Sequence, residues 1–376
     1  MQYRQFGKTG LKVSALGFGC MRFPLLNNGE INVDEAVKQL RSAIDRGVNY
    51  LDTAYPYHGG KSEGVVAKAI KDGYREKVYL ADKNPVWLVN KHEDFEKYLD
   101  EQLSRLETDY IDFYLLHALD KGRWDKIKAL GAVDFIKKAL QSGKIKHAGF
   151  SFHDNTAAFK EIVDAYDWDF CQIQYNYMDE YNQAGVEGLK YAAAKGMAVI
   201  IMEPLLGGKL AKTPPKVIQE IWDGAEIKRT PAEWALRWIW NQPEVSLLLS
   251  GMNDIKQVDE NIRTAESAFV GAMKPEELAL VDKVKNKYKE LTRVSCTACR
   301  YCMPCPAGVD IPGNFAVYNE AAVYDNWDNC RKYYSRRKET EKASSCVECG
   351  KCEKVCPQHL SIRQHLKELH GELTTV

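Results

Sequence analysis

The strongest constraint on the fold is a regular alternation of strand-like and helix-like segments through residues 16–265. Short apolar runs alternate with longer segments whose apolar residues recur every three or four positions, which is the period of an α-helix. The predicted strands comprise residues 16–20, 49–52, 78–81, 111–116, 145–150, 171–175, 197–201 and 245–249. The predicted helices comprise residues 33–47, 62–71, 92–106, 126–142, 154–165, 184–195, 231–240 and 254–265. Strands that are each followed by a helix, eight times within roughly 250 residues, predict an α/β fold, the (β/α)8 TIM barrel.

The segments around this pattern fit the same architecture. Residues 2–8 and 11–15 alternate around a Thr-Gly pair, which indicates a β-hairpin ahead of the first barrel strand. A doubly wound open sheet is the alternative fold, but no GxGxxG follows the first strand. One more amphipathic helix follows Pro275, so we expect the barrel domain to comprise residues 1–290.

Four polar residues follow the ends of three successive predicted strands. Asp52 ends the second strand, and Tyr57 lies in the loop beyond it. Lys83 follows the third strand, and His117 follows the fourth. A barrel brings the carboxyl ends of its strands to one rim, where barrel enzymes carry their catalytic residues. The sequence therefore predicts one site that contains all four side chains.

These four residue types suit the reduction of a carbonyl group. A tyrosine can protonate the carbonyl oxygen as a hydride reaches the carbon, although its ordinary pKa of about 10 is high for that task. A lysine cation would lower that pKa, an aspartate would hold the lysine, and a neutral histidine would hydrogen-bond the substrate oxygen. Taken singly, Asp52 reads equally well as a structural cap, Lys83 as a surface lysine and His117 as a packed histidine, so the prediction rests on the combination.

The chain resembles the aldo-keto reductase family in a series of segments from residue 1 to about residue 265. After the N-terminal hairpin, the matching segments are LGFGCMRFP, YLDTAYPYHGGKSE, VYLADK, IDFYLLH, KIKHAGFS, CQIQYNY and LLSGMNDIKQVDEN. The order and spacing of the segments that contain the four polar residues make the resemblance specific.

This resemblance implies a carbonyl reductase that binds a nicotinamide cofactor, in extended form, across the top of the barrel. By position it assigns Tyr57 as the acid, and the other three polar residues as those that modulate it and orient the substrate. It places Ser151 and Gln174 against the nicotinamide. Along the rest of the cofactor it places Gly207, Ser250, Gln257, Glu260 and Asn261.

The chain departs from the family pattern in two places. Many members have Ser-Asn after the fifth strand, where this chain has Ser151 followed by Phe and His153. Members specific for NADPH place cations against the 2′-phosphate, where this chain has Gly251 or Met252, and Gln257. The loss of a cation leaves the choice between NADP and NAD open, with the neighbouring Lys256 as a substitute cation or a solvated helix residue.

Eight cysteines fall in two groups within residues 291–376, the predicted second domain. The first group is Cys296, Cys299, Cys302 and Cys305, the second is Cys346, Cys349, Cys352 and Cys356, and a proline follows each group. The second group has the C-x2-C-x2-C-x3-C-P spacing of bacterial ferredoxins, and the first is one residue shorter. In two-cluster ferredoxins the fourth cysteine ligates the other cluster. We therefore expect two [4Fe-4S] clusters, with Cys356 completing the first and Cys305 the second.

Zinc is the alternative occupant of these cysteine groups. Zinc sites use C-x2-C pairs with a long separation, which these closely spaced triplets fit poorly. Residues 312–338 have helical periodicity, and with the cysteine spacing they resemble the α-helical ferredoxin-like domain of respiratory-type iron–sulfur subunits. The three remaining cysteines, Cys20, Cys171 and Cys330, are expected to pack in hydrophobic cores.

Composition restricts the partners. The chain has 52 basic and 52 acidic residues, which argues against a nucleic-acid or membrane-surface binder. No apolar run approaches the roughly 20 residues of a membrane span, and no export signal is recognisable, so we expect a cytoplasmic protein. The basic stretch of residues 331–338 is a candidate docking site for a ferredoxin or flavodoxin, although such runs are more often solvated helix faces.

Together these features predict an oxidoreductase that reduces a small-molecule carbonyl substrate with NADPH or NADH, and whose clusters connect it to a further redox partner. A nicotinamide transfers two electrons as hydride and a cubane passes one, so exchange between them requires a splitter such as a flavin. Two alternatives follow. The barrel could hold FMN and pass electrons from a hydride donor to a one-electron carrier, or the clusters could be purely structural or sensory in a binding module.

Overall fold

The computed structural model describes residues 1–296, 300–356 and 358–375. These residues form two compact units. We call residues Met1–Lys212 and Arg229–Pro275 the barrel unit, and residues Thr213–Lys228 and Glu276–Val376 the C-terminal unit. The two units are defined by contacts within the structure. The domain boundary predicted from the sequence, between residues 290 and 291, stays a prediction.

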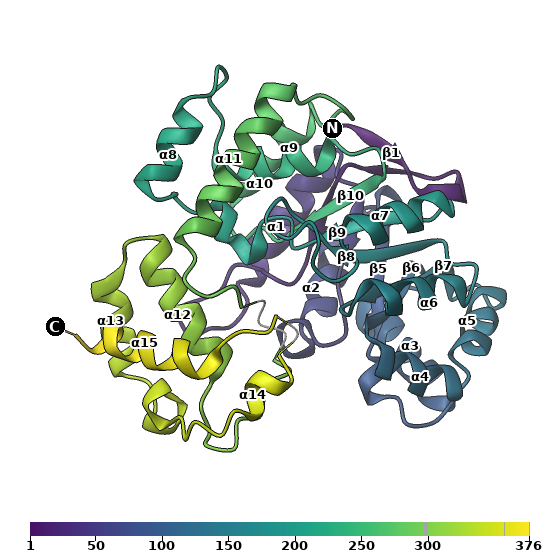
Figure 1. The fold of residues 1–376 in the computed structure, drawn as a ribbon. Coiled ribbons are helices and arrows are strands. Elements are labelled where there is room, and N and C mark those ends of the chain that lie inside the picture. Colours follow the sequence, from purple (N-terminus) through teal and green to yellow (C-terminus); the bar gives the residue numbers. More distant parts are fainter. Residues whose placement is uncertain (297–299, 357, 376) are drawn as a thin grey trace. The chain divides into compact units, whose positions relative to one another are not determined.

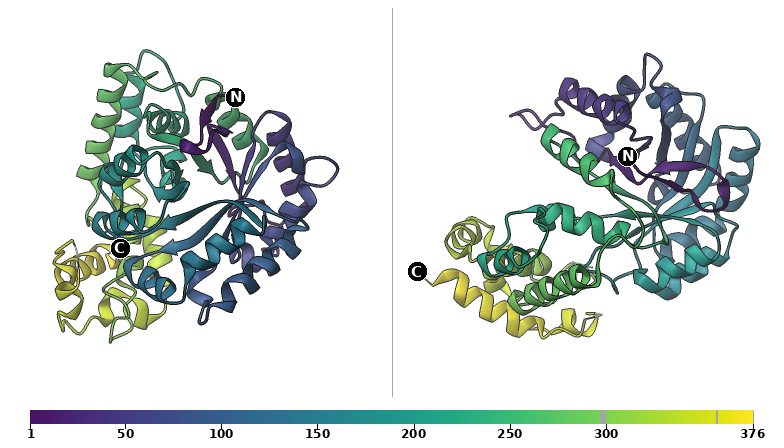
Figure 2. Two further views of the ribbon diagram at one scale, coloured as in Figure 1. Left: turned by 90° about the vertical axis from the view of Figure 1, so that its right-hand side faces the viewer. Right: turned by 90° about the horizontal axis from the view of Figure 1, so that it is seen from above.

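The barrel unit is built on eight parallel strands that close in the order β10-β3-β4-β5-β6-β7-β8-β9. The strands are β3 (Leu16–Gly19), β4 (Tyr50–Asp52), β5 (Tyr79–Asn84), β6 (Ile111–Leu119), β7 (Ile145–Phe152), β8 (Phe170–Gln174), β9 (Ala198–Met202) and β10 (Val245–Ser250). Helices lie outside the ring of strands (Figure 1, Figure 2). They are α1 (Val33–Asp45), α2 (Ser62–Ala69), α3 (Glu93–Leu106), α4 (Lys121–Ala129), α5 (Ala132–Gln141), α6 (Thr156–Asp164), α7 (Gly185–Ala194), α9 (Pro231–Trp240) and α10 (Ile255–Ala265). The predicted (β/α)8 barrel is confirmed.

Several outer helices begin at a residue whose side chain accepts a hydrogen bond from a backbone N–H of the first turn. These capping residues are Asn32, Asp120, Asn155, Thr230 and Asp254. Such caps satisfy N–H groups that the helix itself leaves unpaired. The strands between them are buried on both faces, as in β8 and β10, which explains their continuous apolar sequences.

One predicted helix is wrong. Residues 126–142 were expected to form a single helix, but the structure has two, α4 and α5, separated at Leu130 and Gly131. Gly131 has φ 82°, a left-handed conformation that ends one helix and that glycine adopts without steric cost. The periodicity of the apolar residues continues across this break, which concealed it.

The N-terminal hairpin closes the bottom of the barrel. Strand β1 (Tyr3–Gln5) pairs antiparallel with β2 (Lys12–Ser14), which confirms the predicted hairpin, although a 3-10 turn at Gly7–Thr9 replaces the end of the predicted first strand. Phe6 is fully buried, and its ring centroid lies 4.3 Å from that of Phe113 on β6. The hairpin thus contributes to the same interior cluster as the barrel strands.

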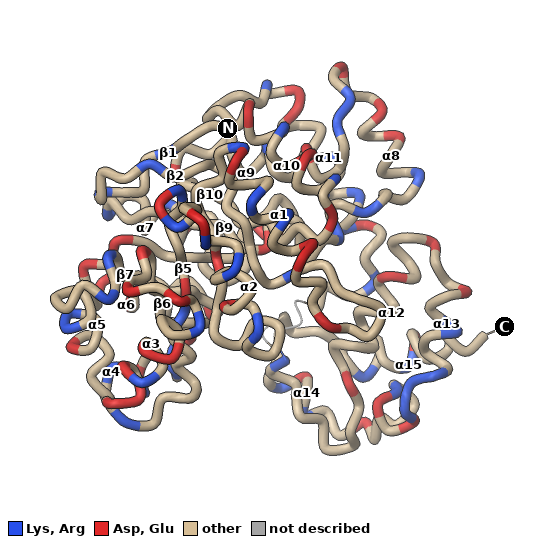
Figure 3. The backbone as a smooth tube through the Cα atoms, turned by 180° about the vertical axis from the view of Figure 1, so that it is seen from behind, with Lys and Arg blue, Asp and Glu red and all other residues tan. Residues whose placement is uncertain are grey.

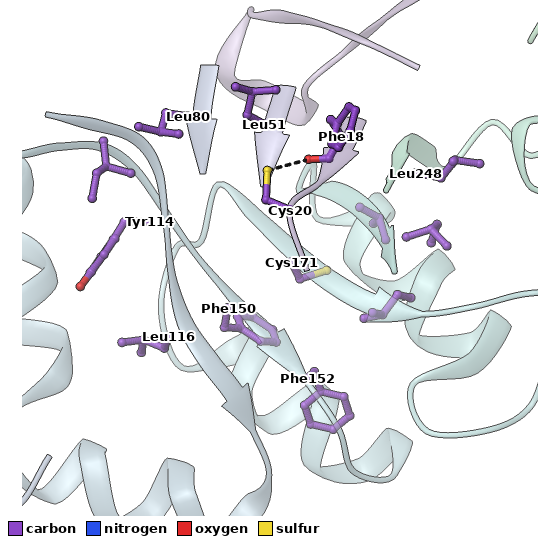
Figure 4. Close-up of a cluster of buried hydrophobic side chains, with 14 of the residues drawn as sticks. Phe18, Cys20, Leu51, Leu80, Tyr114, Leu116, Phe150, Phe152, Cys171 and Leu248 are labelled. Carbon is purple, nitrogen blue, oxygen red and sulfur yellow. Dashed lines mark hydrogen bonds between the residues drawn. The ribbon is translucent and has the colours of Figure 1, made fainter. Parts of the chain in front are cut away.

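A larger hydrophobic core fills the space between the strands and the outer helices. Figure 4 shows part of it, with Phe150, Phe152 and Leu248 projecting from the strands. Cys20 and Cys171 are fully buried in this core, and the Cys20 thiol donates to the Phe18 carbonyl at 3.8 Å. Core packing is therefore confirmed for both cysteines.

Two glycine substitutions in the barrel unit should have opposite effects on stability. A Cβ at Gly149 on β7 would lie 2.5 Å from the Phe170 carbonyl oxygen, so Gly149→Ala should lower the free energy of unfolding by about 1–3 kcal/mol. A Cβ at Gly64 within α2 would meet no atom within 4 Å, so Gly64→Ala should raise it by about 0.5–1 kcal/mol. Denaturant unfolding of both variants tests the packing, and equal effects would contradict it.

The C-terminal unit consists of helices around their own core. The helices are α8 (Lys216–Asp223), α11 (Pro275–Leu291), α12 (Ile311–Val323), α13 (Trp327–Ser335), α14 (Lys351–Lys354) and α15 (Ile362–Thr374). The core contains Phe315, Tyr318, Tyr334, Leu366 and Leu369, and Cys330 is buried in it as expected. The predicted helical stretch 312–338 appears as α12 and α13, whereas α8, α14 and α15 were not predicted. None of the helices in the described residues is both long and apolar enough to cross a membrane.

Candidate active site and cysteine pockets

The barrel brings the four predicted polar residues to neighbouring strands. Asp52 ends β4, Lys83 lies near the end of β5, and His117 lies in β6. Tyr57 begins a 3-10 turn, Tyr57–Gly60, in the loop after β4. Strands β4, β5 and β6 are consecutive in the barrel, so their carboxyl ends share one rim.

A buried ion pair forms the base of this site. The Lys83 Nζ lies 2.7 Å from Asp52 Oδ1 and also donates to the Thr53 carbonyl at 2.6 Å. Lys83 is fully buried and Asp52 is 2% exposed. Removing either charge would leave the other buried without its counter-ion, so each residue holds the other in place.

Tyr57 and His117 contact this base. The Lys83 ammonium lies 4.8 Å from the centre of the half-buried Tyr57 ring, and the rings of Tyr57 and His117 meet edge to face at 6.0 Å. Trp87 also contacts His117, with ring centroids 5.2 Å apart. The predicted group of four is therefore brought together, with an aromatic side chain beside it.

A backbone irregularity sets the place of His117. The pairing of β6 with β7 shifts register between Leu116 and Leu119, and Ala118 has φ 54°. The Ala118 N–H donates to Ser151 Oγ at 2.7 Å. Bulges of this kind redirect side chains next to active sites, and nothing in the sequence pattern indicated this one.

The electrostatics of the site differ from the prediction in one respect. Burial raises the pKa of Tyr57 above its ordinary value, and the Lys83 ammonium offsets only part of that rise. The Lys83 cation thus acts in the predicted direction, but the pKa as a whole is raised, because the desolvation of the phenol outweighs the attraction of the cation. A phenol that stays protonated at neutral pH remains a proton donor.

Lys83 and His117 differ in charge: Lys83 is a cation and His117 is neutral. Burial works to lower the pKa of Lys83, but the Asp52 carboxylate raises it above its ordinary value, as does the Tyr57 oxygen when it is ionised, so the ammonium persists. Burial lowers the pKa of His117 well below its ordinary value, and the Lys83 cation adds to this effect. His117 is therefore neutral, and within the described residues its buried Nδ1 has no hydrogen-bond partner.

The predicted cofactor residues occupy the remaining strands of the barrel. Ser151 lies on β7, Gln174 ends β8, Gly207 follows β9, and Ser250 ends β10. The side chains of Ser151 and Gln174 are 2% and 4% exposed, respectively. Gln174 donates to Asp179 Oδ2 at 2.7 Å, which fixes the orientation of its amide. The structure thus places these residues at the same rim as the group of four.

Helix α10 holds the other three predicted cofactor residues. Asn261 donates to Ser250 Oγ at 2.9 Å and ties the helix to β10. Gln257 is exposed, and its side-chain oxygen accepts a hydrogen bond from the Asn253 N–H. The Glu260 carboxylate accepts a hydrogen bond from the Thr230 hydroxyl. Each side chain therefore has a partner within the protein.

The predicted phosphate end of the cofactor has a cation that the sequence reasoning missed. Met252 is fully buried, which leaves Gly251 and Gln257 of the positions considered for phosphate contact. A Cβ on Gly251 would lie 3.2 Å from Arg22 Cβ, and one on Gly207 would lie 3.7 Å from Arg22 Nη2. The exposed Arg22 therefore lies close to both Gly207 and Gly251, two positions considered for the cofactor that are distant from Arg22 in sequence.

Two pockets in the C-terminal unit are lined by the clustered cysteines. Cys296, Cys302 and Cys356 line the first, together with apolar side chains such as Phe315 and Leu360. The second is lined by Cys305, Cys346, Cys349 and Cys352, and Cys302 borders it as well. Cys356 thus lies with the first cysteine group and Cys305 with the second, although the ligand assignment itself stays a prediction. Cys299 lies outside the described residues.

The two pockets carry the donor type that an iron–sulfur cluster needs. Across residues 1–296, 300–356 and 358–375, no group of three or more His, Cys, Asp or Glu side chains is placed to hold a metal ion. Four-iron cubanes are held by cysteine thiolates, and the seven described cysteines of the two groups line the pockets. The residues present therefore fit an iron–sulfur cluster.

The basic stretch 331–338 is not a uniformly positive face. Arg331 lies 3.5 Å from Asp328, Arg337 lies 2.7 Å from Asp310, and the side chain of Arg337 is 9% exposed. Acidic and basic residues are interspersed along this part of the chain (Figure 3). These ion pairs favour the interpretation of a solvated helix face over a docking site.

Comparison with known sequences agrees with both parts of the molecule. The sequence model of the aldo/keto reductase family matches residues 15–286. The chain belongs to the aldo/keto reductase family. A model described as a 4Fe-4S dicluster domain matches residues 295–361. The predicted fusion of an aldo/keto reductase barrel with a 4Fe-4S domain is thus confirmed.

Related proteins share the barrel over most of their length. The chain is 28% identical to L-galactose dehydrogenase of Arabidopsis thaliana, covering 78% of this chain and 97% of that protein. It is 26% identical to a probable aldo-keto reductase 1 of Glycine max, over 69% and 82% of the two chains. The structure of aldo-keto reductase AKR11C1 from Bacillus halodurans (holo form) superposes with a TM-score of 0.64 at 25% identity, over 76% and 96% of the chains. This aldo/keto reductase is therefore an oxidoreductase with an added 4Fe-4S domain.

Proposed function

We propose that this protein reduces a small carbonyl compound with NADPH or NADH at the rim of the barrel. The observation that carries the proposal is the buried Lys83–Asp52 ion pair beneath Tyr57, with a neutral His117 beside it. Oxidoreductases of the same family share this barrel, and nicotinamide is the cofactor associated with the family. The family match lends no support to FMN.

The residues at the rim are suited to a nicotinamide. Ser151 accepts a hydrogen bond from Ala118, so its own O–H is left to donate. The Gln174 amide is held by Asp179 and retains a second N–H. A carboxamide substituent offers acceptors and donors that match these two buried side chains.

Each residue of the group of four has a role in the proposed reaction. When bound, a reduced nicotinamide supplies the hydride that the carbonyl carbon accepts. Tyr57 gives its phenolic proton to the carbonyl oxygen, which becomes the hydroxyl of the product, and regains a proton from solvent. The Lys83 ammonium stabilises the transient phenolate, Asp52 fixes that ammonium, and the neutral imidazole of His117 donates one N–H to the carbonyl oxygen.

The cysteine pockets are proposed to hold two [4Fe-4S] clusters that exchange single electrons with a further partner, such as a ferredoxin or flavodoxin. Cys296, Cys299, Cys302 and Cys356 would ligate the first, and Cys305, Cys346, Cys349 and Cys352 the second. The lining of the two pockets supports this pairing for the seven described cysteines. A structural or sensory role for the clusters is the alternative.

Iron analysis should separate the ligand cysteines from the core cysteines. Cys346→Ser is expected to reduce the iron and acid-labile sulfide of anaerobically purified protein by about half, because one of two cubanes loses a thiolate. Cys171→Ala, which removes a buried thiol in the barrel unit, should leave both contents unchanged. Equal iron in all three proteins would contradict the assignment.

Arg22 is the proposed contact for a cofactor phosphate. Its loss in Arg22→Ala should raise the KM for the nicotinamide about tenfold, which corresponds to about 1.4 kcal/mol of binding free energy. Lys256→Ala removes an exposed cation on α10 and serves as the comparison. A rise for NADPH alone would place Arg22 at the 2′-phosphate, and a rise for both cofactors would place it at the pyrophosphate. No change for either would contradict the contact.

An anaerobic titration tests how the two redox centres are related. Purified protein is mixed with NADPH or NADH, first alone and then with a panel of aldehydes and ketones, while its visible spectrum is recorded. We expect carbonyl-dependent oxidation of the nicotinamide with the iron–sulfur absorbance unchanged. Bleaching by the nicotinamide alone would favour the flavin alternative, and no carbonyl-dependent oxidation would contradict the proposed function.

A further inference from the structure

Two fully buried carboxyl groups lie behind the strand that carries Lys83. Asp82 precedes Lys83 on β5, and Glu63 lies in the first turn of α2. Both side chains are 0% exposed. Because neighbouring residues of a strand point to opposite faces, Asp82 faces the helices while Lys83 faces the barrel interior. The reaction proposed above uses neither carboxyl group.

Side chains hold the Lys83 backbone on the side of β4, while on the other side β5 stays paired with β6 at Lys83. The pairing of β5 with β4 ends at Ala81, opposite Asp52. Beyond it, the Lys83 N–H donates to Asp82 Oδ1 at 2.8 Å, and the Lys83 carbonyl accepts from Gln102 Nε2 at 3.0 Å. The position of the ammonium therefore depends on the Asp82 carboxyl as well as on Asp52.

The remaining oxygens of the two carboxyl groups lack conventional donors. Asp82 Oδ2 and Glu63 Oε1 are both buried, and neither has a hydrogen-bond partner when both groups are ionised. The two side chains are within hydrogen-bonding reach of each other. Two carboxylates at that separation repel, and a single shared proton converts the repulsion into a hydrogen bond.

The surrounding charges decide which carboxyl carries the proton. Arg105 Nη1 lies 2.9 Å from Glu63 Oε2, so Glu63 has a cation that stabilises its ionised form. Asp82 accepts only from a peptide N–H, and burial raises its pKa well above the ordinary value, as does the Glu63 charge.

Of the other polar groups nearby, Gln102 also stabilises the ionised form of Glu63, and the rest are engaged elsewhere. Glu101 on α3 lies 3.6 Å from Arg105 and accepts from Tyr55, and Tyr114 on β6 donates to Gln102. Asp52 is paired with Lys83 on the opposite face of the strand. None of these contacts supplies a hydrogen-bond donor to Asp82 Oδ2, so a proton held by Asp82 itself best satisfies the pair.

We infer that Asp82 and Glu63 share one proton, with a neutral Asp82 donating to ionised Glu63, and that this pair is a positioning device for Lys83. The pair fixes α2 to β5 and holds the Lys83 peptide, so the ammonium stays beneath Tyr57. The positioning role rests on the proposed reductase function, whereas the shared proton does not.

Infrared spectroscopy tests the shared proton without substrate or cofactor. Full-chain protein purified anaerobically at neutral pH should show the carbonyl stretch of a neutral carboxylic acid, and this band should shift when aspartate is labelled with ¹³C. Asp82→Asn should remove the band. Glu187→Gln, which changes an exposed acid paired with Lys160, should leave it in place. A labelled protein with no band that depends on Asp82 would overturn the inference.

Kinetics with two substitutions test the positioning role. Asp82→Asn keeps an oxygen acceptor for the Lys83 N–H and a donor toward Glu63, so kcat should stay within a few-fold of the wild-type value. Asp82→Ala loses both contacts and should lower kcat by about tenfold to a hundredfold, with little change in KM. Equal losses in the two variants would overturn the role of the proton, and no loss in either would overturn the positioning role. An infrared result as expected, with no reductase activity in any variant, would count against the proposed function alone.

Discussion

Replacement of Tyr57 by phenylalanine should lower kcat for carbonyl reduction by about 10²–10⁴-fold, the range that a positioned general acid contributes. The phenol stays protonated at neutral pH, since burial raises its pKa, and it can therefore donate its proton, whereas the Lys83 ammonium is held by its ion pair with Asp52. The ring itself remains in Tyr57→Phe, so its contacts with His117 and the Lys83 cation are kept. Steady-state rates under anaerobic conditions measure the effect.

A matched tyrosine separates the catalytic hydroxyl from a structural one. Tyr191 on the outer helix α7 donates its hydroxyl to the exposed Asp164, not to any of the four polar residues of the site. Tyr191→Phe should leave kcat unchanged, and both variants should bind the nicotinamide as the wild type does. Carbonyl reduction at an undiminished rate in Tyr57→Phe would rule out the proposed acid.

Replacement of Lys83 by methionine should have the largest effect on stability as well as abolishing reduction. Asp52 would remain buried beside an apolar side chain, and removing one partner of a buried pair costs about 3–5 kcal/mol. Burial raises the pKa of Asp52, so protonation can relieve the unpaired charge. The loss should therefore be greatest above the raised pKa of the buried Asp52, should shrink as the pH falls from there toward the ordinary pKa of an aspartate, and should be gone below that value. Denaturant unfolding at several pH values measures this dependence.

The double variant Asp52→Asn/Lys83→Met provides the control for this prediction. It removes both charges, so most of the lost stability should return, because a neutral buried pair carries no uncompensated charge. Activity should not return, since the cation that stabilises the phenolate is still absent. Additive losses in the double variant would contradict the ion pair, because two contacting residues should show strong coupling.

The barrel was predictable because each of its repeats carries a local signal. Strands buried on both faces have continuous apolar sequences, and the outer helices have apolar residues at helical spacing. The break between α4 and α5 was missed because the apolar residues keep their helical spacing across Gly131. The break is visible in the left-handed backbone of Gly131, which the spacing of apolar residues does not reveal. Helices α8 and α15 were missed because no strand follows them to mark a repeat.

The site was predictable in its residues and less so in its energetics. Strand ends place Asp52, Lys83 and His117 on one rim, as barrel topology requires. The raised pKa of Tyr57 depends on how deeply its hydroxyl is packed, which sequence spacing does not encode. Arg22 and the Asp82–Glu63 pair are brought near the site by contacts between residues distant in sequence.

The most direct test of the account follows the hydrogen that reaches the carbonyl carbon. Reduced nicotinamide carrying deuterium at its transferable position is given anaerobically to the protein with a carbonyl substrate, and the product is analysed by mass spectrometry. Direct hydride transfer at the Tyr57 site predicts one deuterium on the carbon that bears the new hydroxyl. Product whose hydrogen at that carbon comes from solvent would show that the nicotinamide does not deliver it directly, because electrons then pass through the clusters or through a flavin whose transferable hydrogen exchanges with water, and it would contradict the proposed reaction.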